Sequence, residues 1–151
     1  MNAVEWILQS CDKMFEGAEI DYDTLRRISL DEKFFENYDN IRILNSFLFN
    51  FSKLQDKIGA KLFRTVLYEM KEIDEPNMPM IDILNLLEKL GILESTQDWE
   101  RLREIRNILA HEYPFDEKER IENIGLALEG YDRLKIIYER LRKFYTQKRG
   151  E

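Results

Sequence analysis

The residues best suited to chemistry lie in one short stretch of the chain, from Arg106 to Tyr113. Arg106 carries a permanent positive charge, and His111, the only histidine, belongs to the residue type that titrates near neutral pH. A cation that holds a phosphate and a group that moves a proton are sufficient to cleave RNA without a metal, with the ribose 2'-hydroxyl as nucleophile. The stretch therefore indicates a ribonuclease site.

The same two residues also fit a purely structural interpretation. Arg106 can pair with one of the 30 acidic residues, and His111 can bind the last carbonyls of its helix, where positive charge is favourable. Asp56 becomes a partner for Arg106 if the helices that carry the two residues cross nearby. Structural ion pairs are common, so the residues alone leave both interpretations open.

A helix must position this stretch. Ser95 to Asp98 resembles a capping box, which predicts a helix start near residue 96. Pro114 disfavours helical geometry at the residue before it, so the helix should end near His111 or Glu112.

At about 100 degrees per residue, the apolar side chains of this helix form one broad side that we expect to be core. They are Trp99, Leu102, Ile105, Ile108, Leu109 and Ala110. Arg106 lies at the edge of this apolar arc, where an unpaired guanidinium would be costly to bury. Asn107 and His111 lie on the opposite flank and should reach solvent or another subunit.

The spacing of apolar residues predicts the remaining helices. One covers residues 2–16 and ends at Gly17, 21–28 adds a turn or two, and a long helix begins near 29–31, continues to Met70 and bends or splits at Gly59. The prolines place a loop at 74–79, a helix ending at Gly91 follows, and the last helix begins at Asp116. Four or five helices with short connections predict an all-α, antiparallel up-and-down bundle.

Composition sets the class of protein. A chain of 151 residues with 44% hydrophobic content fits a single helical domain spanning 1–151, and few glycines and prolines with 35% charged residues favour helices. Cys11 is alone, so no intrachain disulfide is possible. Neither a signal peptide nor an apolar run of about 20 residues is visible, so we expect a cytoplasmic protein with no membrane segment.

The net charge of -7 disfavours nonspecific binding to nucleic acid. Residues 131–151 are locally basic, however, with seven positive and three negative side chains. Arg140, Arg142 and Lys143 in this segment either form an ordinary solvated face or guide RNA toward the site. With a single His and Cys far apart, and no Gly-rich phosphate loop, we expect no metal and no cofactor.

Arg106, four intervening residues, His111, one residue and Tyr113 match the R-x4-H-x-Y pattern of the HEPN superfamily. The chain resembles the HepT-like toxins of that superfamily, which are paired with MNT-type minimal nucleotidyltransferases. The segments Trp99 to Ile105 and Phe51 to Gly59 also resemble sequences of this family. The resemblance extends from about Phe34 to the last helix.

This resemblance implies an endoribonuclease toxin whose substrate is RNA. It implies that Arg106 stabilises the phosphate, that His111 acts as acid or base, and that Asn107 assists positioning. Two protomers would form a homodimer in which motifs from both face one cleft. The partner would be a nucleotidyltransferase antitoxin that modifies Tyr113 with AMP, whereas the plain alternative makes Tyr113 a packed loop aromatic.

Two other functions remain open at this point. The chain can be a noncatalytic helical binding subunit of a two-protein nucleotidyltransferase, which forms a complex but cleaves no RNA. It can also be a dimeric helical scaffold without nucleotide or RNA chemistry.

Overall fold

The computed structural model describes residues 1–110 and 116–150, and this part of the chain consists of helices joined by loops, without strands. Its elements are α1 (Ala3–Arg27), the 3-10 helix η1 (Glu32–Glu36), α2 (Tyr38–Lys57), the π-helical turn η2 (Ile58–Leu62), α3 (Phe63–Glu69), α4 (Met80–Lys89), α5 (Thr96–Ala110) and α6 (Glu117–Arg149). The predicted all-α class is confirmed.

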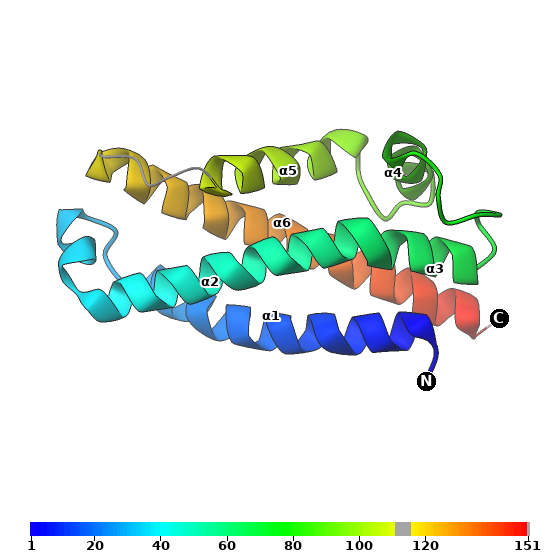
Figure 1. Ribbon diagram of the computed structural model, residues 1–151, viewed down its shortest axis with the longest axis horizontal. Coiled ribbons are helices and arrows are strands. Elements are labelled where there is room, and N and C mark those ends of the chain that lie inside the picture. The colour runs from blue at the N-terminus through cyan, green and yellow to red at the C-terminus, as the bar shows by residue number, and fades with distance from the viewer. Residues whose placement is uncertain (111–115, 151) are drawn as a thin grey trace.

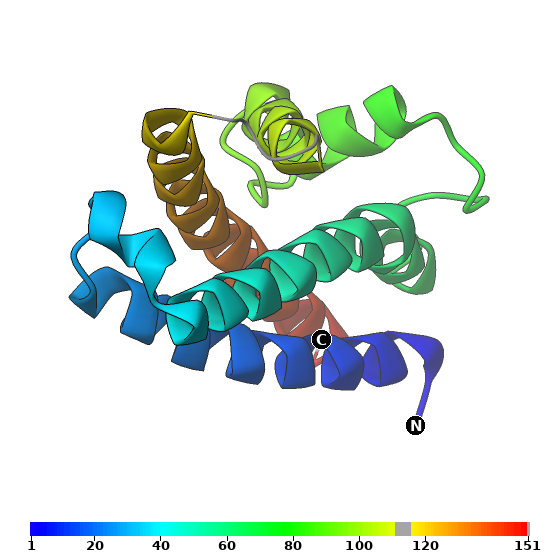
Figure 2. The same ribbon diagram turned by 60° about the vertical axis from the view of Figure 1, so that its left-hand side comes forward.

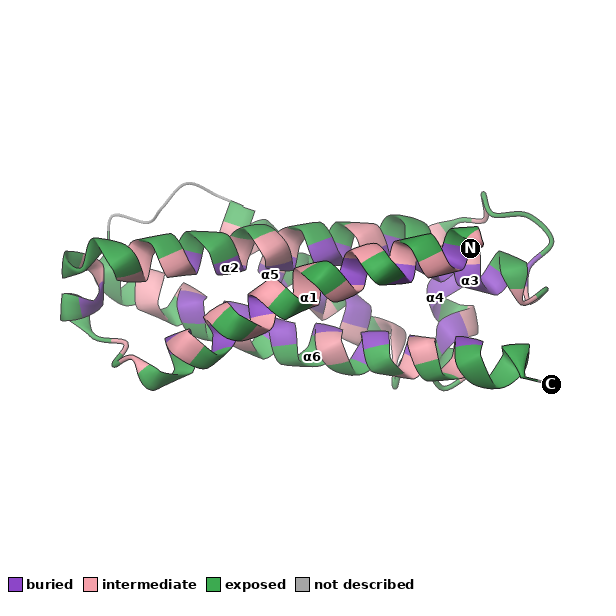
Figure 3. Cartoon of the chain, turned by 90° about the horizontal axis from the view of Figure 1, so that it is seen from below, coloured by how far each residue is buried: buried purple, intermediate pink, exposed green. Residues whose placement is uncertain are grey.

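The long helices form an antiparallel up-and-down bundle, as predicted. α1, then α2 with α3, then α5 and finally α6 run alternately in opposite directions, and α4 lies at one end of the bundle (Figure 1). α5 and α1 lie on opposite sides of the layer that α2 and α6 form (Figure 2). Buried residues lie on the inner faces of the helices (Figure 3), and the largest fully buried side chains include Trp99, Tyr131 and Phe51. No helix in the described ranges is both long enough and apolar enough to cross a membrane.

The first helix is longer than its sequence pattern predicted. α1 passes through Gly17 and continues to Arg27, so the predicted end at Gly17 is wrong. A Cβ at Gly17 would lie 3.4 Å from the side-chain nitrogen of Asn50 on α2. Gly17 therefore lies inside α1, where this helix contacts α2, and does not end the helix.

The predicted start of the long helix near 29–31 is also wrong. The Asp31 carboxylate accepts a hydrogen bond from the backbone N–H of Lys33 and caps η1, a separate short helix. α2 begins only at Tyr38, where the side chain of Asn37 accepts from the N–H of Asp39.

The long helix forms a π-turn around Gly59 and does not end there. The backbone stays helical from α2 through η2 into α3, and the Phe63 N–H donates to the Ile58 carbonyl, which is the wider repeat of a π-turn. A Cβ at Gly59 would lie 2.6 Å from Cζ2 of Trp99. The missing side chain thus lets the α5 tryptophan rest directly on the π-turn.

The second half of the chain follows its sequence signals more closely. The loop at 74–79 and the helix after it are present, and Gly91 has a φ of 79 degrees, which favours glycine. α6 begins after Asp116, whose carboxylate accepts from the Lys118 N–H, as predicted.

Polar contacts that repeat every seven residues join α1 to α6 and form a polar ladder between the two helices. The hydroxyl of Tyr138 donates to Asp12 over 2.7 Å, and Arg142 donates two hydrogen bonds of 2.6 and 2.7 Å to the same carboxylate. Tyr131 and Lys135 bind Glu19 in the same manner, one heptad earlier on α6, and Arg149 binds Glu5 one heptad later. Burial raises the pKa of Asp12, but hydrogen bonds from Arg142 and Tyr138 outweigh it and hold that pKa below its usual value.

Candidate functional site

The helix that carries the candidate site begins where the sequence predicted, at Thr96. Its cap differs from the predicted Ser95 to Asp98 box, because the Thr96 N–H donates to the carboxylate of Glu88 over 2.9 Å. The Asp98 carboxylate instead lies 3.6 Å from a guanidinium nitrogen of Arg133 on α6. α5 is therefore fixed at its start by the preceding helix and by α6.

The predicted core side of α5 is only half buried. Trp99 and the next two apolar positions are buried, but Ile108 and Leu109 are partly exposed and Ala110 is exposed. Leu109 still packs against the core, so the expectation that all six residues are core is wrong only at the end of the helix, where Ala110 is exposed and Ile108 is partly exposed.

Arg106 has the partner that the sequence suggested. Its Nη2 donates to Oδ2 of Asp56 on α2 over 2.9 Å, so the helices cross at this point. The side chain of Arg106 is 35% exposed and that of Asp56 is 51% exposed, and such pairs contribute at most about 1 kcal/mol to stability. The Nε of Arg106 is buried and has no hydrogen-bond partner among the described residues.

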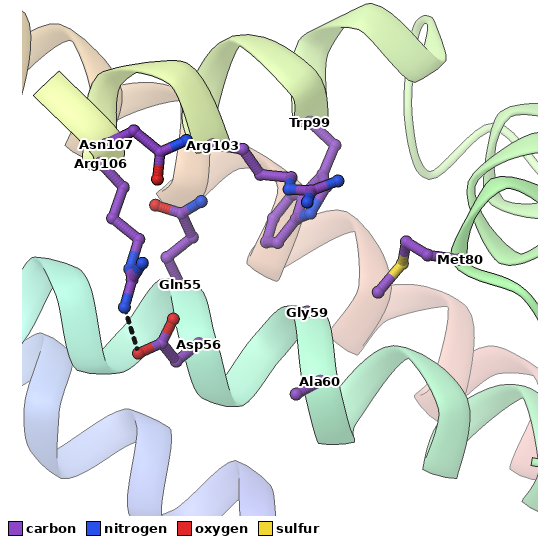
Figure 4. Close-up of a pocket in the computed structure, with 9 residues that line it drawn as sticks. All are labelled: Gln55, Asp56, Gly59, Ala60, Met80, Trp99, Arg103, Arg106 and Asn107. Carbon is purple, nitrogen blue, oxygen red and sulfur yellow. Dashed lines mark hydrogen bonds and ion pairs between the residues drawn. The ribbon is translucent and has the colours of Figure 1, made fainter. Parts of the chain in front are cut away.

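Arg106 stands at the edge of a groove of about 320 Å³ between α2, η2 and α5 (Figure 4). The ion pair forms one end of this groove, amide side chains form its middle, and small or apolar side chains form the other end. Its lining residues are Gln55, Asp56, Gly59, Ala60, Met80, Trp99, Arg103, Arg106 and Asn107.

Gln55 is a site residue that the sequence analysis missed. It is 3% exposed, and its Oε1 is buried without a hydrogen-bond partner among the described residues. Its place in the apolar stripe of α2, four residues after Phe51 and three before Ile58, is the signal that predicts burial. Figure 4 shows its side chain rising from α2 toward Asn107 on α5.

The other predicted site residues divide into two groups. Asn107 is exposed, as predicted, and it lines the same groove as Arg106. His111 and Tyr113 lie outside the described residues, so their roles stay predictions.

The basic residues of α6 lie apart from the groove. Arg140 pairs with Glu94 over 3.2 Å and Arg142 with Asp12, while Lys143 is exposed, and none of the three lines the groove. A role of these residues in guiding RNA stays a prediction.

One aromatic residue of α2 is exposed. Phe47 and Phe51 are fully buried, whereas Phe49, between them in sequence, is 62% exposed. The Nζ of Lys53 lies 5.7 Å from the centre of the Phe49 ring. Helical spacing of aromatic residues favours core positions, which holds for Phe47 and Phe51, whereas the exposure of Phe49 fits the alternative that it belongs to a dimer face.

No group of three or more His, Cys, Asp or Glu side chains suited to holding a metal gathers within 1–110 and 116–150. A comparison of the chain with protein-family models, with curated proteins and with solved structures finds no match.

Proposed function

We propose that the chain is an endoribonuclease toxin that cleaves RNA without a metal, with Arg106 and His111 as its catalytic residues. The observation that carries this proposal is the position of Arg106. Its guanidinium is partly exposed at the edge of a groove, and Asp56 fixes it from the neighbouring helix. A fixed cation beside a groove is suited to holding a phosphate in one orientation.

The proposed reaction uses the RNA's own hydroxyl. The 2'-oxygen of one nucleotide attacks the adjacent phosphorus as the bond from that phosphorus to the next 5'-oxygen breaks. His111 acts as acid or base, giving a proton to the leaving 5'-oxygen or accepting the proton of the 2'-hydroxyl, while Arg106 stabilises the charge on the phosphate. The products are a 2',3'-cyclic phosphate and a free 5'-hydroxyl.

The proposed enzyme is a homodimer with one shared cleft. Phe49 lies seven residues before Asp56, which places both on the same face of α2. A phenylalanine that is 62% exposed beside the site supports contact with a second protomer there, because large exposed apolar groups are typical of interfaces. One chain with a net charge of -7 supplies few cationic groups to the cleft, and a second protomer would add its own.

The proposed antitoxin is an MNT-type nucleotidyltransferase that adds AMP to Tyr113. The added phosphate brings negative charge close in sequence to His111 and would repel RNA. Incubation with the nucleotidyltransferase and ATP should increase the mass of the wild-type chain and leave Tyr113→Phe unchanged. Modification that survives this substitution contradicts the assignment of Tyr113.

The proposal is tested by expressing the chain in bacterial cells and recording growth. Wild type should arrest growth, whereas Arg106→Ala and His111→Ala should not. Arg101→Ala is the matched control, because Arg101 lies on the same helix but outside the groove and should leave toxicity intact. Growth arrest by wild type and Arg106→Ala alike contradicts the proposal. A chain that binds the nucleotidyltransferase but never arrests growth supports the noncatalytic binding subunit instead.

A further inference from the structure

The floor of the groove contains a polar atom without a partner. Gln55 is only 3% exposed, and its Oε1 accepts no hydrogen bond from the described residues. Burying a carbonyl oxygen without a donor costs free energy, so such an atom needs an explanation. Figure 4 places the Gln55 amide between α2 and α5, below Asn107 and beside Arg106.

A second unpartnered atom lies in the same place and has the opposite character. The Nε–H of Arg106 is a buried donor without an acceptor, and the Oε1 of Gln55 is a buried acceptor without a donor. Both residues line one groove of about 320 Å³, a volume in the range of small-molecule sites. The groove therefore fits a ligand that offers a negatively charged acceptor at one point and a donor at another.

We propose that this groove is a subsite for one unpaired nucleotide of the RNA, with its base contacting Gln55 and its phosphate contacting Arg106. This proposal rests on the proposed ribonuclease function. Proteins that read single-stranded RNA bind splayed-out bases through hydrogen bonds to their edges and through aromatic or guanidinium planes. The groove offers Gln55 and Asn107 for the edge, with Arg103 and Trp99 alongside.

The free acceptor needs a donor on the edge of the base. Adenine and cytosine carry an exocyclic amino donor next to a ring nitrogen that accepts, and uracil carries its N3–H donor next to a carbonyl oxygen, so an amide side chain matches all three. The subsite therefore recognises the hydrogen-bonding edge of a base without distinguishing these three bases. Since Oε1 is shielded from solvent, the Gln55 amide must turn toward the groove as the base enters.

The test measures binding of uridine 3'-monophosphate and of its N3-methylated form, which lacks the N3–H donor, to the full chain by calorimetry. The unmethylated nucleotide should bind about tenfold more tightly than the methylated one, as a good amide-to-base contact provides. Gln55→Met removes the amide and keeps the length of the side chain, so it should abolish this preference. Gln97→Met is the matched control, because Gln97 is exposed at the start of α5, and it should keep the preference.

A second measurement does not depend on the folding of a core variant. In the wild-type chain, the NMR signal of the Gln55 side-chain amide should shift with uridine 3'-monophosphate much more than with its N3-methylated form. Equal affinity for the two nucleotides, no binding, or a preference that survives in folded Gln55→Met overturns the subsite. RNA cleavage together with equal binding of the two nucleotides overturns the subsite and leaves the ribonuclease standing, whereas the expected preference without RNA cleavage refutes the ribonuclease alone.

Discussion

Arg106 on α5 donates a hydrogen bond to Asp56 on α2 across 2.9 Å, and this ion pair joins residues 50 positions apart in the chain. It closes one end of the groove and leaves the guanidinium partly exposed. Asp56 has two opposing effects in the proposed enzyme, since it orients Arg106 and also neutralises part of the charge that a phosphate would meet.

Substitution of Asp56 should separate these two effects. Asp56→Ala frees the guanidinium, so we expect a lower KM for RNA and a kcat reduced about tenfold by the lost orientation. Asp56→Asn keeps an acceptor oxygen and should retain more of kcat. Steady-state cleavage kinetics check both values, and unchanged KM and kcat in Asp56→Ala contradict a positioning role.

Gly59 should tolerate no side chain, because a Cβ there would lie 2.6 Å from the buried ring of Trp99. We expect Gly59→Ala to lower the free energy of unfolding by about 1–3 kcal/mol, the usual cost of overpacking. Gly125→Ala on α6 is the matched control, because a Cβ there meets nothing within 4 Å. That variant should gain up to about 1 kcal/mol from helix propensity. Equal unfolding midpoints of the two variants in urea would contradict the prediction that a side chain at position 59 collides with Trp99.

The exposed Phe49 should contribute to the dimer. Phe49→Glu places a charge at the proposed interface and should shift the chain to monomer in light scattering, with loss of RNA cleavage. Ile20→Glu is the matched control, because Ile20 is 64% exposed on α1, and it should leave the assembly unchanged. A dimer that persists in Phe49→Glu places the interface elsewhere.

Sequence reasoning succeeded best where residues close in the chain carry the signal. α6 begins after Asp116, whose side chain caps it as predicted, and such capping signals act within one turn. α5 also begins where predicted, at Thr96, although Glu88 of the preceding helix accepts the hydrogen bond there. The pairing of Arg106 with Asp56 was suggested because an arginine at the edge of an apolar face needs a partner.

Several of the errors concern contacts between helices. Gly17 was interpreted as a helix end, although it lies inside α1 where that helix contacts Asn50 of α2. Gln55 was missed because its type suggests exposure, while its place in the apolar stripe of α2 decides its burial. The polar ladder between α1 and α6 was missed although its residues recur every seven positions, because pairing across antiparallel helices needs their register.

The ladder between α1 and α6 should make the fold sensitive to acid. The folded pKa of Asp12 lies below its unfolded value, so its stabilisation is complete above the unfolded carboxyl pKa of about 4 and is lost as pH falls through the folded pKa. The midpoint of urea unfolding should therefore fall between pH 5 and about 3. Asp12→Asn should flatten this decline, whereas Glu16→Gln, on the same helix but outside the ladder, should keep it. An identical decline in Asp12→Asn contradicts the role of the ladder.

The central claim is tested most directly by the rate of RNA cleavage in vitro with a chelator present, compared between wild type and Arg106→Ala. Wild type should cut RNA to ends with 2',3'-cyclic phosphates, and Arg106→Ala should lose about 100-fold or more of the rate, the usual cost of removing a group that stabilises developing charge. Arg101→Ala should cut at the wild-type rate. Cleavage by Arg106→Ala at the rate of wild type, or no cleavage by wild type, would contradict the account.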